Sequence, residues 1–547
     1  MQQSLLTRFV REQIALASPT RYPRCQLPSH SLVSMPGNVL FITVDQWRGD
    51  CLSVAGHPVV ETPTLDRLAA SGVRFANHWA NAAPCGPSRA CLYTGTYLHH
   101  HRSVQNGTPL DARFTNVALV ARQAGYNPVL FGYTDTSVDP RTVPLDDPRL
   151  FTYEGVLPGF DPIVVDPWCE GSPAWGRWLT DRGVDVPGCI RDLYRPVTDF
   201  PGAADHGASW APAGFSAENS ETAFLVERLI DWLDHHGDKP FFIHASFIRP
   251  HPPYRNPPGY HDRYDADAIA PFVAAPTRDA EAAVHPFNQL ALANGDAAAP
   301  ERELDRRQLR ATYYGAQREV DDRLGELFEY LDRAGLAADT LVVLTSDHGE
   351  MGCDHWLTEK LGYWDESYYV PLIVCDPRSA ADGTRGSVVD EFTESVDVLP
   401  TLCDWMGVDV PAQVDGMSLR PFVHGEPTPQ WRTEAHFEWD FSMPDSPQTQ
   451  ETLGLPLSHS WLAVVRGRTR KYVQFAAASS LLPPLLFDLE SDPLQLDNLA
   501  GDPTRVGDAW AEVQRLLQWR MRNEDRTLSG HFLSPEQGLV MACDEWR

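Results

Sequence analysis

Four short apolar runs along the chain alternate with longer stretches of helical periodicity. The first run, residues 38–44, is continuous and β-branched, as in a strand buried on both faces of a parallel sheet. Similar runs occupy residues 128–131, 241–247 and 340–345. Apolar residues at helical spacing predict helices between them, over about 63–71, 115–123, 221–235 and 303–333. This alternation predicts an α/β sandwich around a large mixed, mostly parallel sheet flanked by helices.

The first predicted helix has recognisable end signals. Thr62 directly precedes Pro63, an order typical of an N-cap followed by the first helical residue. Gly72 follows the last apolar position of the helical pattern. We therefore expect Thr62 to cap this helix and Gly72 to end it.

Polar side chains follow each of the four predicted strands. In chain order they are Asp45 and Gln46, then Tyr133 and Asp135, then His251, and finally Asp347 and His348. Ligands of such sheets bind beyond the carboxyl ends of the strands, so we expect these side chains to converge on one face. The Pro- and Asp-rich stretch at residues 139–201 is expected to form long insertions over that face.

The pattern changes after about residue 410. Shorter strand candidates at residues 461–465 and 471–475, followed by a helical stretch at about 506–521, predict a smaller C-terminal α+β domain. The expected organisation has four parts: a loosely ordered N-terminal extension (1–37), a catalytic α/β domain (38–410), the α+β domain (411–521) and a C-terminal tail (522–547).

Composition and charge narrow the class of protein and of partner. The 547 residues are 43% hydrophobic and 22% charged, which is ordinary for a folded enzyme and too apolar for a disordered chain. The formal net charge of −29 disfavours a nucleic acid or an anionic membrane as the main partner. A small anionic substrate would therefore need a local basic pocket.

We expect neither a secretion signal nor a membrane-spanning segment. Residues 1–37 mix arginines with prolines and lack the apolar core of a secretory signal, and residues 475–487 are too short to cross a bilayer. The ten cysteines form no CxxC pair or regular framework. We expect reduced thiols and a cytoplasmic location.

The most specific local signal is the string Cys85-Gly86-Pro87-Ser88-Arg89, which leads into a helix-like run. Cys85 would then lie at a helix N-terminus, where free backbone N–H groups and the helix dipole stabilise an anionic substrate and its developing charge. A C-x-P string alone would more often be a turn with a buried cysteine. The full C-x-P-S-R string is far more specific.

This string is the signature of formylglycine-dependent sulfatases. From about residue 38 to its end, the chain resembles sulfatase-like members of the alkaline phosphatase superfamily, most closely the bacterial phosphonate monoester hydrolases/phosphodiesterases. The resemblance is carried by residues 44–48, 85–89, 104–106, 132–134, 249–253, 345–350 and 526–528. It implies an alkaline-phosphatase-like fold and hydrolysis of phosphonate monoesters and phosphodiesters through a covalent intermediate, with promiscuous sulfatase activity. An arylsulfatase is the alternative.

The resemblance also implies that a maturation enzyme oxidises Cys85 to formylglycine. Once hydrated, the aldehyde offers one hydroxyl that attacks phosphorus or sulfur, and a second whose deprotonation expels the product. A thiolate would form a covalent adduct with no second hydroxyl to expel the product, so modification of Cys85 belongs to the functional hypothesis. Arg89, one turn later, is expected to orient the hydrate and the metal shell.

One divalent metal ion is expected between two strand ends. Asp45 and Gln46 with Asp347 and His348 are hard oxygen and imidazole donors that can hold a cation together, although either pair alone is usually a loop cap. The resemblance implies that all four are ligands. Their chemistry allows Ca²⁺, Mg²⁺, Mn²⁺ or Zn²⁺, and the histidine favours a transition metal.

A third set of candidates would contact the substrate. By resemblance, Asn106, Tyr133, His251 and Lys360 touch the transferred group or assist the leaving group, with His251 the best general-acid candidate. The subgroup usually has threonine where this chain has Asp135, so the role of that substrate-binding candidate is not carried over. Sulfatases commonly place a further lysine near this point, and the less positive pocket here should prefer monoanionic esters.

Two other features have simpler interpretations. Residues 99–101 are three consecutive histidines, and adjacent residues on a helix point in different directions, so we expect a helix end rather than a metal site. The tail at residues 522–547 resembles the terminus of the hydrolase subgroup, and we expect it to pack on a neighbouring subunit of a homo-oligomer, a homotetramer.

Two further functions fit the sequence less well than a one-metal hydrolase. A two-metal phosphatase or mutase would need a second Asp/His cluster and a Ser or Thr nucleophile, which the sequence does not offer. A non-catalytic binding protein would not need Cys85, Arg89 and all four ligand candidates together. A turnover assay with an aryl ester separates the enzyme from the binding protein.

Overall fold

The structure is a computed structural model of the chain. It describes residues 37–165, 172–428, 430–442, 454–525, 529, 531–536 and 538–541. Apart from Gly37, the predicted N-terminal extension (1–37) lies outside the described residues, and so do residues 526–528 and 542–547 of the tail.

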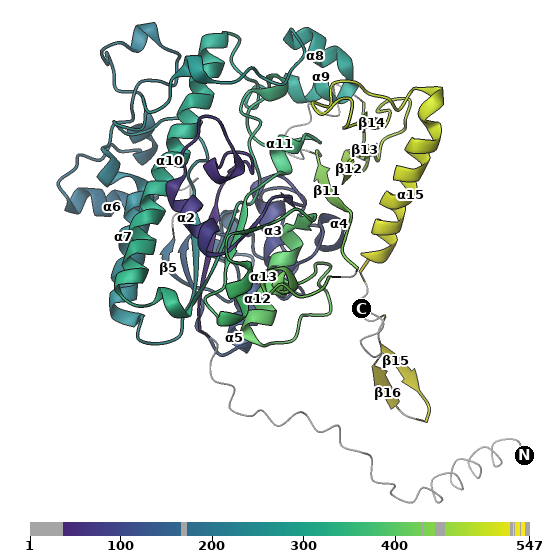
Figure 1. The fold of residues 1–547 in the computed structure, drawn as a ribbon, viewed down its shortest axis with the longest axis horizontal. Coiled ribbons are helices and arrows are strands. Elements are labelled where there is room, and N and C mark those ends of the chain that lie inside the picture. Colours follow the sequence, from purple (N-terminus) through teal and green to yellow (C-terminus); the bar gives the residue numbers. More distant parts are fainter. Residues whose placement is uncertain are drawn as a thin grey trace, which may run out of the picture. The chain divides into compact units, whose positions relative to one another are not determined.

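An eight-stranded sheet forms the centre of the unit that begins at Gly37 (Figure 1). Its order is β5-β4-β6-β1-β7-β8-β2-β9. The strands are β1 (Asn38–Val44), β2 (Val73–Phe75), β4 (Val129–Gly132), β5 (Asp161–Val165), β6 (Phe242–Phe247), β7 (Thr340–Thr345), β8 (Leu372–Cys375) and β9 (Ser387–Val389). The strands from β5 to β7 are parallel to one another, whereas β8 is antiparallel to both β7 and β2. The predicted mixed, mostly parallel sheet is confirmed.

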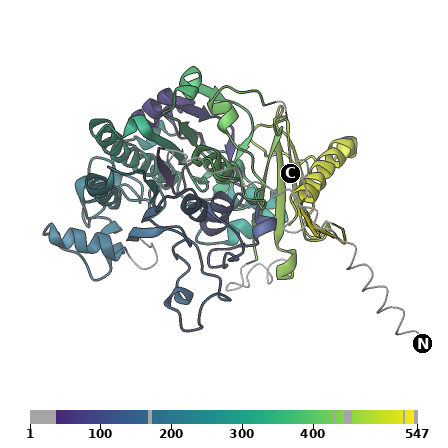
Figure 2. The ribbon, with the colours of Figure 1, turned by 90° about the horizontal axis from the view of Figure 1, so that it is seen from below.

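Alternate residues of the central strand β1 contribute to two separate cores. Leu40 and Ile42 pack with helices on one face of the sheet, and Val39 and Phe41 pack with helices on the other. The first face is covered by α2 (Pro63–Ser71), α6 (Pro173–Asp181), α7 (Glu221–His236) and α10 (Glu303–Arg333), the second by α3 (Cys85–Thr94), α5 (Val117–Gln123) and α12 (Val398–Met406) (Figure 2). Because both faces are covered, residues 39–42 and 44 are all apolar, and the strand does not alternate between apolar and polar positions.

The predicted helices form, and α2 begins and ends where its signals predict, with Thr62 as the N-cap residue and Pro63 as the first helical residue. Thr62 precedes α2, yet its side chain makes no capping hydrogen bond. The carboxylate of Asp321 on α10 accepts instead from the backbone N–H groups of Thr64 and Leu65, at 3.0 and 2.9 Å. A carboxylate brought by a packed neighbour satisfies these orphan donors more strongly than a hydroxyl. Gly72 ends α2 as expected.

The stretch at residues 139–201, predicted to form only insertions, also contains regular secondary structure. It supplies the edge strand β5, which pairs with β4, and the helix α6. Proline at position 162 is tolerated there because an edge strand has one side without ladder hydrogen bonds.

A second sheet, which is antiparallel, follows the eight-stranded sheet along the chain. Its strands are β11 (Glu434–Asp440), β12 (Trp461–Gly467), β13 (Arg470–Phe475) and β14 (Leu485–Asp488), in that order. Helix α15 (Val506–Arg522) packs on it through Leu516 and Trp519 (Figure 1). The predicted C-terminal α+β character is therefore confirmed. The domain boundaries near residues 410 and 521 stay a prediction.

The described part of the C-terminal tail contains two short strands. Beyond residue 522, β15 (His531–Ser534) and β16 (Gly538–Met541) pair as an antiparallel hairpin. None of the helices in the described ranges is both long enough and apolar enough to cross a bilayer.

Candidate active site

Four neighbouring parallel strands bring the predicted residues to one edge of the sheet. In the order β4, β6, β1, β7 these strands are adjacent, so their carboxyl ends lie side by side. The residues that follow them are Tyr133 and Asp135 after β4, His251 after β6, Asp45 and Gln46 after β1, and Asp347 and His348 after β7. The site thus lies where ligands of such sheets bind.

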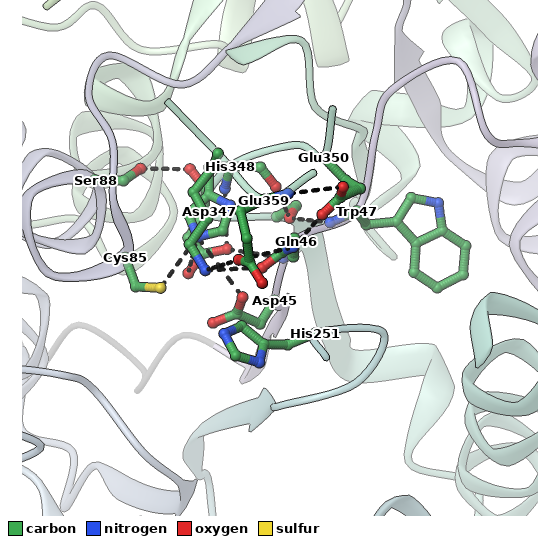
Figure 3. A network of polar contacts seen from close by, with 12 residues as sticks. Asp45, Gln46, Trp47, Cys85, Ser88, His251, Asp347, His348, Glu350 and Glu359 are labelled. Atoms are coloured by element: carbon green, nitrogen blue, oxygen red, sulfur yellow. Dashed lines mark hydrogen bonds and ion pairs between the residues drawn. The ribbon is translucent and has the colours of Figure 1, made fainter. Parts of the chain in front are cut away.

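Cys85 is the first residue of α3, as its motif predicts. Its side chain is buried, and its Sγ lies 3.1 Å from Nε2 of His348 (Figure 3). The backbone N–H of Gly86 donates to Oδ1 of Asn106 at 2.8 Å. Ser88 donates its hydroxyl proton to the carbonyl of residue 347. The start of α3 is therefore held against the end of β7.

A buried arginine joins the two acidic strand ends. Nη2 of Arg89 lies 3.1 Å from Oδ2 of Asp45, and its Nε lies 2.8 Å from Oδ2 of Asp347; all three side chains are fully buried. Burial alone would lower the pKa of Arg89, but Tyr133, Asp347 and Asp45 raise it well above its usual value. Arg89 therefore stays charged and sets the distance between the carboxylates.

The same carboxylates belong to a compact group of potential metal ligands. One ligand atom each from Asp45, Cys85, Asp347 and His348 lies within 4.8 Å of the others. Oδ1 of Asp45 is buried without a hydrogen-bond partner among the described residues, and Nε2 of His348 is 3.7 Å from it. A buried carboxylate oxygen is costly unless a cation or a donor satisfies it. The donor set therefore fits a divalent cation.

Gln46 reaches this group by its backbone, while its side chain turns elsewhere. Its N–H donates to Oδ1 of Asp347 at 3.2 Å, in a left-handed conformation with a φ of 67°. Its Oε1 accepts from Nζ of Lys360 at 2.8 Å, and its Nε2 donates to the hydroxyl of Tyr254 at 3.2 Å and to Glu350. The role of Gln46 as a metal ligand stays a prediction.

Two acids near Lys360 were not predicted as site residues. Oε2 of Glu359 lies 3.1 Å from Nζ of Lys360, and Glu350 accepts from the hydroxyl of Tyr254. Burial, together with the charge of Glu359, raises the pKa of Glu350 to about 7. Only their positions in the sequence could have marked these two acids as site residues. Glu350 ends the motif that starts at residue 345, and Glu359 directly precedes Lys360.

A cavity of about 60 Å³ lies among the predicted substrate residues. It is lined by Asp45, Cys85, Asn106, Tyr133, Asp135, Tyr153, Glu154, Ile248, His251 and Lys360. Arg89 lies behind it, donating to the hydroxyl of Tyr133 at 2.8 Å. Tyr153 and Glu154 belong to the insertion after β4, where no motif marked them.

The groups that could move protons differ in charge. Burial lowers the pKa of His251 below its usual value, and Lys360 lowers it further, while Asp45 opposes the shift. Burial also disfavours the charge of Lys360, but Cys85, Glu359 and Asp45 raise the pKa of Lys360 well above its usual value. Lys360 is thus the cation of the cavity at neutral pH, and the general-acid role of His251 stays a prediction.

The unmodified thiol of Cys85 is a weak nucleophile in this setting. Burial raises the pKa of Cys85 well above its usual value, and Asp45 and Asp347 raise it further against the opposing effect of Lys360. The thiol is therefore protonated at neutral pH, whereas the thiolate is the reactive form. The position suits a chemically modified side chain better than a catalytic thiolate.

The three consecutive histidines contact three different partners. They lie on the short helix α4 (Leu98–His101). Nδ1 of His99 is 2.8 Å from Glu438, Nδ1 of His100 is 3.0 Å from Asp415, and Nε2 of His101 is 3.2 Å from the sulfur of residue 91. They do not converge on one point, which agrees with the expectation of a helix end.

Comparison with known families agrees with the geometry. A family model described as Sulfatase matches residues 37–408. The chain belongs to the sulfatase family. In this sulfatase-family protein, residues 352–526 also match a model described as N-sulphoglucosamine sulphohydrolase, C-terminal. Membership implies a hydrolase acting on ester bonds, a divalent metal ion and a formylglycine residue.

Individual relatives of this sulfatase-family protein cover nearly the whole chain. The multifunctional alkaline phosphatase superfamily protein PehA of Trinickia caryophylli is 40% identical over 523 residues, which are 92% of this chain and 98% of PehA. The phosphonate monoester hydrolase of Agrobacterium radiobacter superposes with a TM-score of 0.86 at 41% identity, covering 92% of this chain and 99% of that one. The phosphonate monoester hydrolase SpPMH of Silicibacter pomeroyi superposes with a TM-score of 0.85 at 38% identity. The superposition covers 92% of this chain and 99% of SpPMH. The alkaline-phosphatase-like fold is confirmed.

Proposed function

We propose that this protein hydrolyses phosphonate monoesters and phosphodiesters through a covalent intermediate, with promiscuous sulfatase activity. The observation that carries the proposal is the placement of Cys85 at the start of α3, in one compact group with Asp45, Asp347 and His348. The phosphonate monoester hydrolases named above, alike over nearly the whole chain, support this substrate class. The alternative is an arylsulfatase, an activity that the match to the Sulfatase model leaves open.

The cofactors are assigned to named residues. Asp45, Asp347 and His348 would hold one divalent metal ion, with Gln46 as the proposed fourth ligand. The ion would lower the pKa of the nucleophile and neutralise charge on the substrate oxygens. Mn²⁺, Ca²⁺, Mg²⁺ and Zn²⁺ all suit oxygen and imidazole donors, and the histidine favours a transition metal.

The remaining residues position and stabilise the ester. Formylglycine made from Cys85 by a maturation enzyme would supply, once hydrated, both the attacking hydroxyl and the second hydroxyl that releases the product. Lys360 keeps its proton and offers positive charge to the ester oxygens. His251 is the proposed proton donor to the leaving group, and Asn106 and Tyr133 line the place of the transferred group.

Pocket charge points to monoanionic substrates. Arg89 is already paired with Asp45 and Asp347, which leaves Lys360 as the strong cation that lines the cavity. Asp135 lines the same cavity and adds negative charge when ionised. A dianionic phosphate monoester needs more compensating charge than a phosphonate monoester or a phosphodiester, and uncompensated buried charge is costly.

The direct test is kcat/KM for four aryl esters that share one leaving group: a phosphonate monoester, a phosphodiester, a phosphate monoester and a sulfate. We expect the phosphonate and the diester to exceed the phosphate monoester by about tenfold or more, which is about 1.4 kcal/mol in the transition state. Sulfate should be hydrolysed more slowly than both. A leading sulfate would replace the proposal by the arylsulfatase, and a leading phosphate monoester would refute the charge argument.

We also propose a homo-oligomer, a homotetramer. Helix α15 exposes Val506, Trp510, Leu517 and Met521 at spacings that place them along one side, each 57% to 63% exposed. A contiguous apolar stripe of this kind is typical of an interface. Light scattering should give an oligomer for the full chain and smaller species for Trp510→Glu and for deletion of residues 522–547. A monomeric full chain contradicts the proposal.

The proposed location is the cytoplasm. All seven cysteines within the described ranges are free thiols, which supports a reducing compartment. The net charge of −29 supports small anionic esters and the maturation enzyme as partners, with no nucleic-acid or membrane partner.

A further inference from the structure

The carboxyl group of Asp135 stands apart from the other polar groups of the site. Asp135 is only 7% exposed, and its Oδ1 is buried with no hydrogen-bond partner among the described residues. It lines the cavity of about 60 Å³ together with Glu154. A buried carboxylate oxygen without a donor is unusual in a folded protein, and it marks a place where a ligand group can supply the missing contact.

The cations of the site are engaged elsewhere. Arg89 pairs with Asp45 and Asp347, at 3.1 and 2.8 Å. Lys360 lies 3.1 Å from Glu359 and donates to Gln46 at 2.8 Å. Neither cation forms an ion pair with Asp135 among the described residues, and Arg89 acts on its charge only from a position paired with two other carboxylates.

The surroundings of Asp135 repel further negative charge. The pKa of Asp135 is raised to about 7, because burial disfavours its charge and Glu154, Asp45 and Asp347 repel it, against the opposing effect of Arg89. A carboxyl group of this kind becomes a stable carboxylate when a cation is placed beside it. A positively charged substrate group would therefore gain more at this position than a neutral one.

The backbone holds this carboxyl group close to the reacting side chain. Asp135 has a φ of 51°, in the left-handed region that residues other than glycine rarely adopt. Its carbonyl oxygen lies 3.4 Å from the position that a Cβ on Gly86 would take, directly beside Cys85. A substituent on a phosphorus atom attached at position 85 would thus lie within a short distance of Asp135.

A second cavity leaves room for the leaving group. It has a volume of about 240 Å³ and is lined by residues that include Pro84, Lys360 and Trp439, but neither Asp135 nor Glu154 is among them. Lys360 lines both cavities. With the leaving group in the larger cavity, the substituent that stays on phosphorus would lie in the smaller one, beside Asp135.

We propose that Asp135 and Glu154 form a subsite for a cation, so that preferred substrates carry a small ammonium group on the substituent that stays on phosphorus. The inference rests on the proposed hydrolysis of phosphonate monoesters and phosphodiesters and names their substituent class. The small volume of the cavity favours a primary ammonium group over a bulky quaternary one. Asp135 is the specificity-determining residue, and Glu154 adds negative charge at the cavity wall.

The test compares two aryl phosphonates that differ by one charged group. The 4-nitrophenyl monoester of 2-aminoethylphosphonate carries an ammonium group where that of propylphosphonate carries a methyl group. For formylglycine-bearing wild-type enzyme we expect kcat/KM to favour the ammonium ester by about tenfold or more, which corresponds to about 1.4 kcal/mol. Asp135→Asn, which removes the charge and keeps the shape, should reduce this ratio about tenfold, and Glu154→Gln should reduce it less.

A control variant and the possible outcomes separate failure of the subsite from failure of the proposed function. Asp146→Asn removes an exposed acid from the same insertion and should leave the ratio unchanged. Equal kcat/KM for the two esters in wild-type enzyme, or a ratio that survives Asp135→Asn, overturns the subsite while the proposed function stands. An equal loss on both esters in Asp135→Asn also overturns it, because Asp135 would then act without its charge. Failure of active-site-modified enzyme to hydrolyse either ester overturns the proposed function itself.

A second measurement covers the case in which Asp135→Asn does not fold. Free 2-aminoethylphosphonate and propylphosphonate compete with a neutral aryl phosphonate for wild-type enzyme. We expect the amine to have the lower inhibition constant by about tenfold, since the gain arises from one ion pair in a buried site. Equal inhibition constants contradict the subsite without any variant.

Discussion

Replacing Cys85 by alanine is expected to lower kcat for every aryl ester by about 10⁴-fold or more, because the side chain that becomes the nucleophile is gone. The fold should persist, since Cys85 starts α3 and its neighbours Gly86 and Ser88 keep their hydrogen bonds. Steady-state kinetics and thermal unfolding measure the two effects separately. An active alanine variant would exclude any covalent role for this position.

Cys85→Ser is the matched variant, because serine offers one hydroxyl where hydrated formylglycine offers two. The single hydroxyl can accept the phosphoryl or phosphonyl group but has no second hydroxyl to expel it. We expect a burst of at most one equivalent of the phenol leaving group, followed by arrest. Rapid-quench measurement of the burst checks this, and steady turnover by the serine variant would contradict the release step.

Removing Asp347 should abolish metal binding and activity together. Elemental analysis is expected to find one divalent ion per chain in the wild-type protein and none in Asp347→Ala. Alanine also leaves Arg89 with one fewer carboxylate partner, and breaking a buried ion pair costs about 3–5 kcal/mol. Asp347→Asn keeps the shape of the side chain and separates metal loss from unfolding.

The control for this prediction is an acid in an ion pair away from the cluster. Asp365 pairs with Arg466 and Lys471 at 3.0 and 2.7 Å, next to the C-terminal sheet. Asp365→Asn should lose stability yet keep the full metal content. Two metal equivalents in the wild-type protein, or an active preparation without metal, would contradict the one-metal site.

The fold was predictable where burial on both sides dictates the pattern. The run that forms β1 is apolar at residues 39–42 and 44, on both faces of the sheet, because helices cover both faces. Features decided by long-range packing were not predictable. The cap of α2 comes from Asp321, far along the chain on α10, and β8 turns antiparallel because its direction depends on the connection after β7 rather than on its own residues.

The candidate site was predictable in its strand ends and its cysteine motif, since both are local patterns. The surroundings of Lys360 and Asp135 depend on contacts between distant segments. Glu350 and Lys360 meet Gln46 only after β1 and β7 pair. Glu154 reaches the cavity through an insertion whose sequence carries no motif. Packing decides where these side chains point. The side chain of Gln46, for example, contacts Lys360 and Glu350, which lie far along the chain.

The most direct test of the account is the chemical state of residue 85 in active enzyme. Preparations made with and without the maturation enzyme are compared by peptide mass spectrometry and by kcat on an aryl phosphonate monoester. The account predicts that kcat rises in proportion to the fraction of formylglycine and extrapolates to zero when all of the residue is thiol. A fully active preparation that contains only unmodified Cys85 would contradict it.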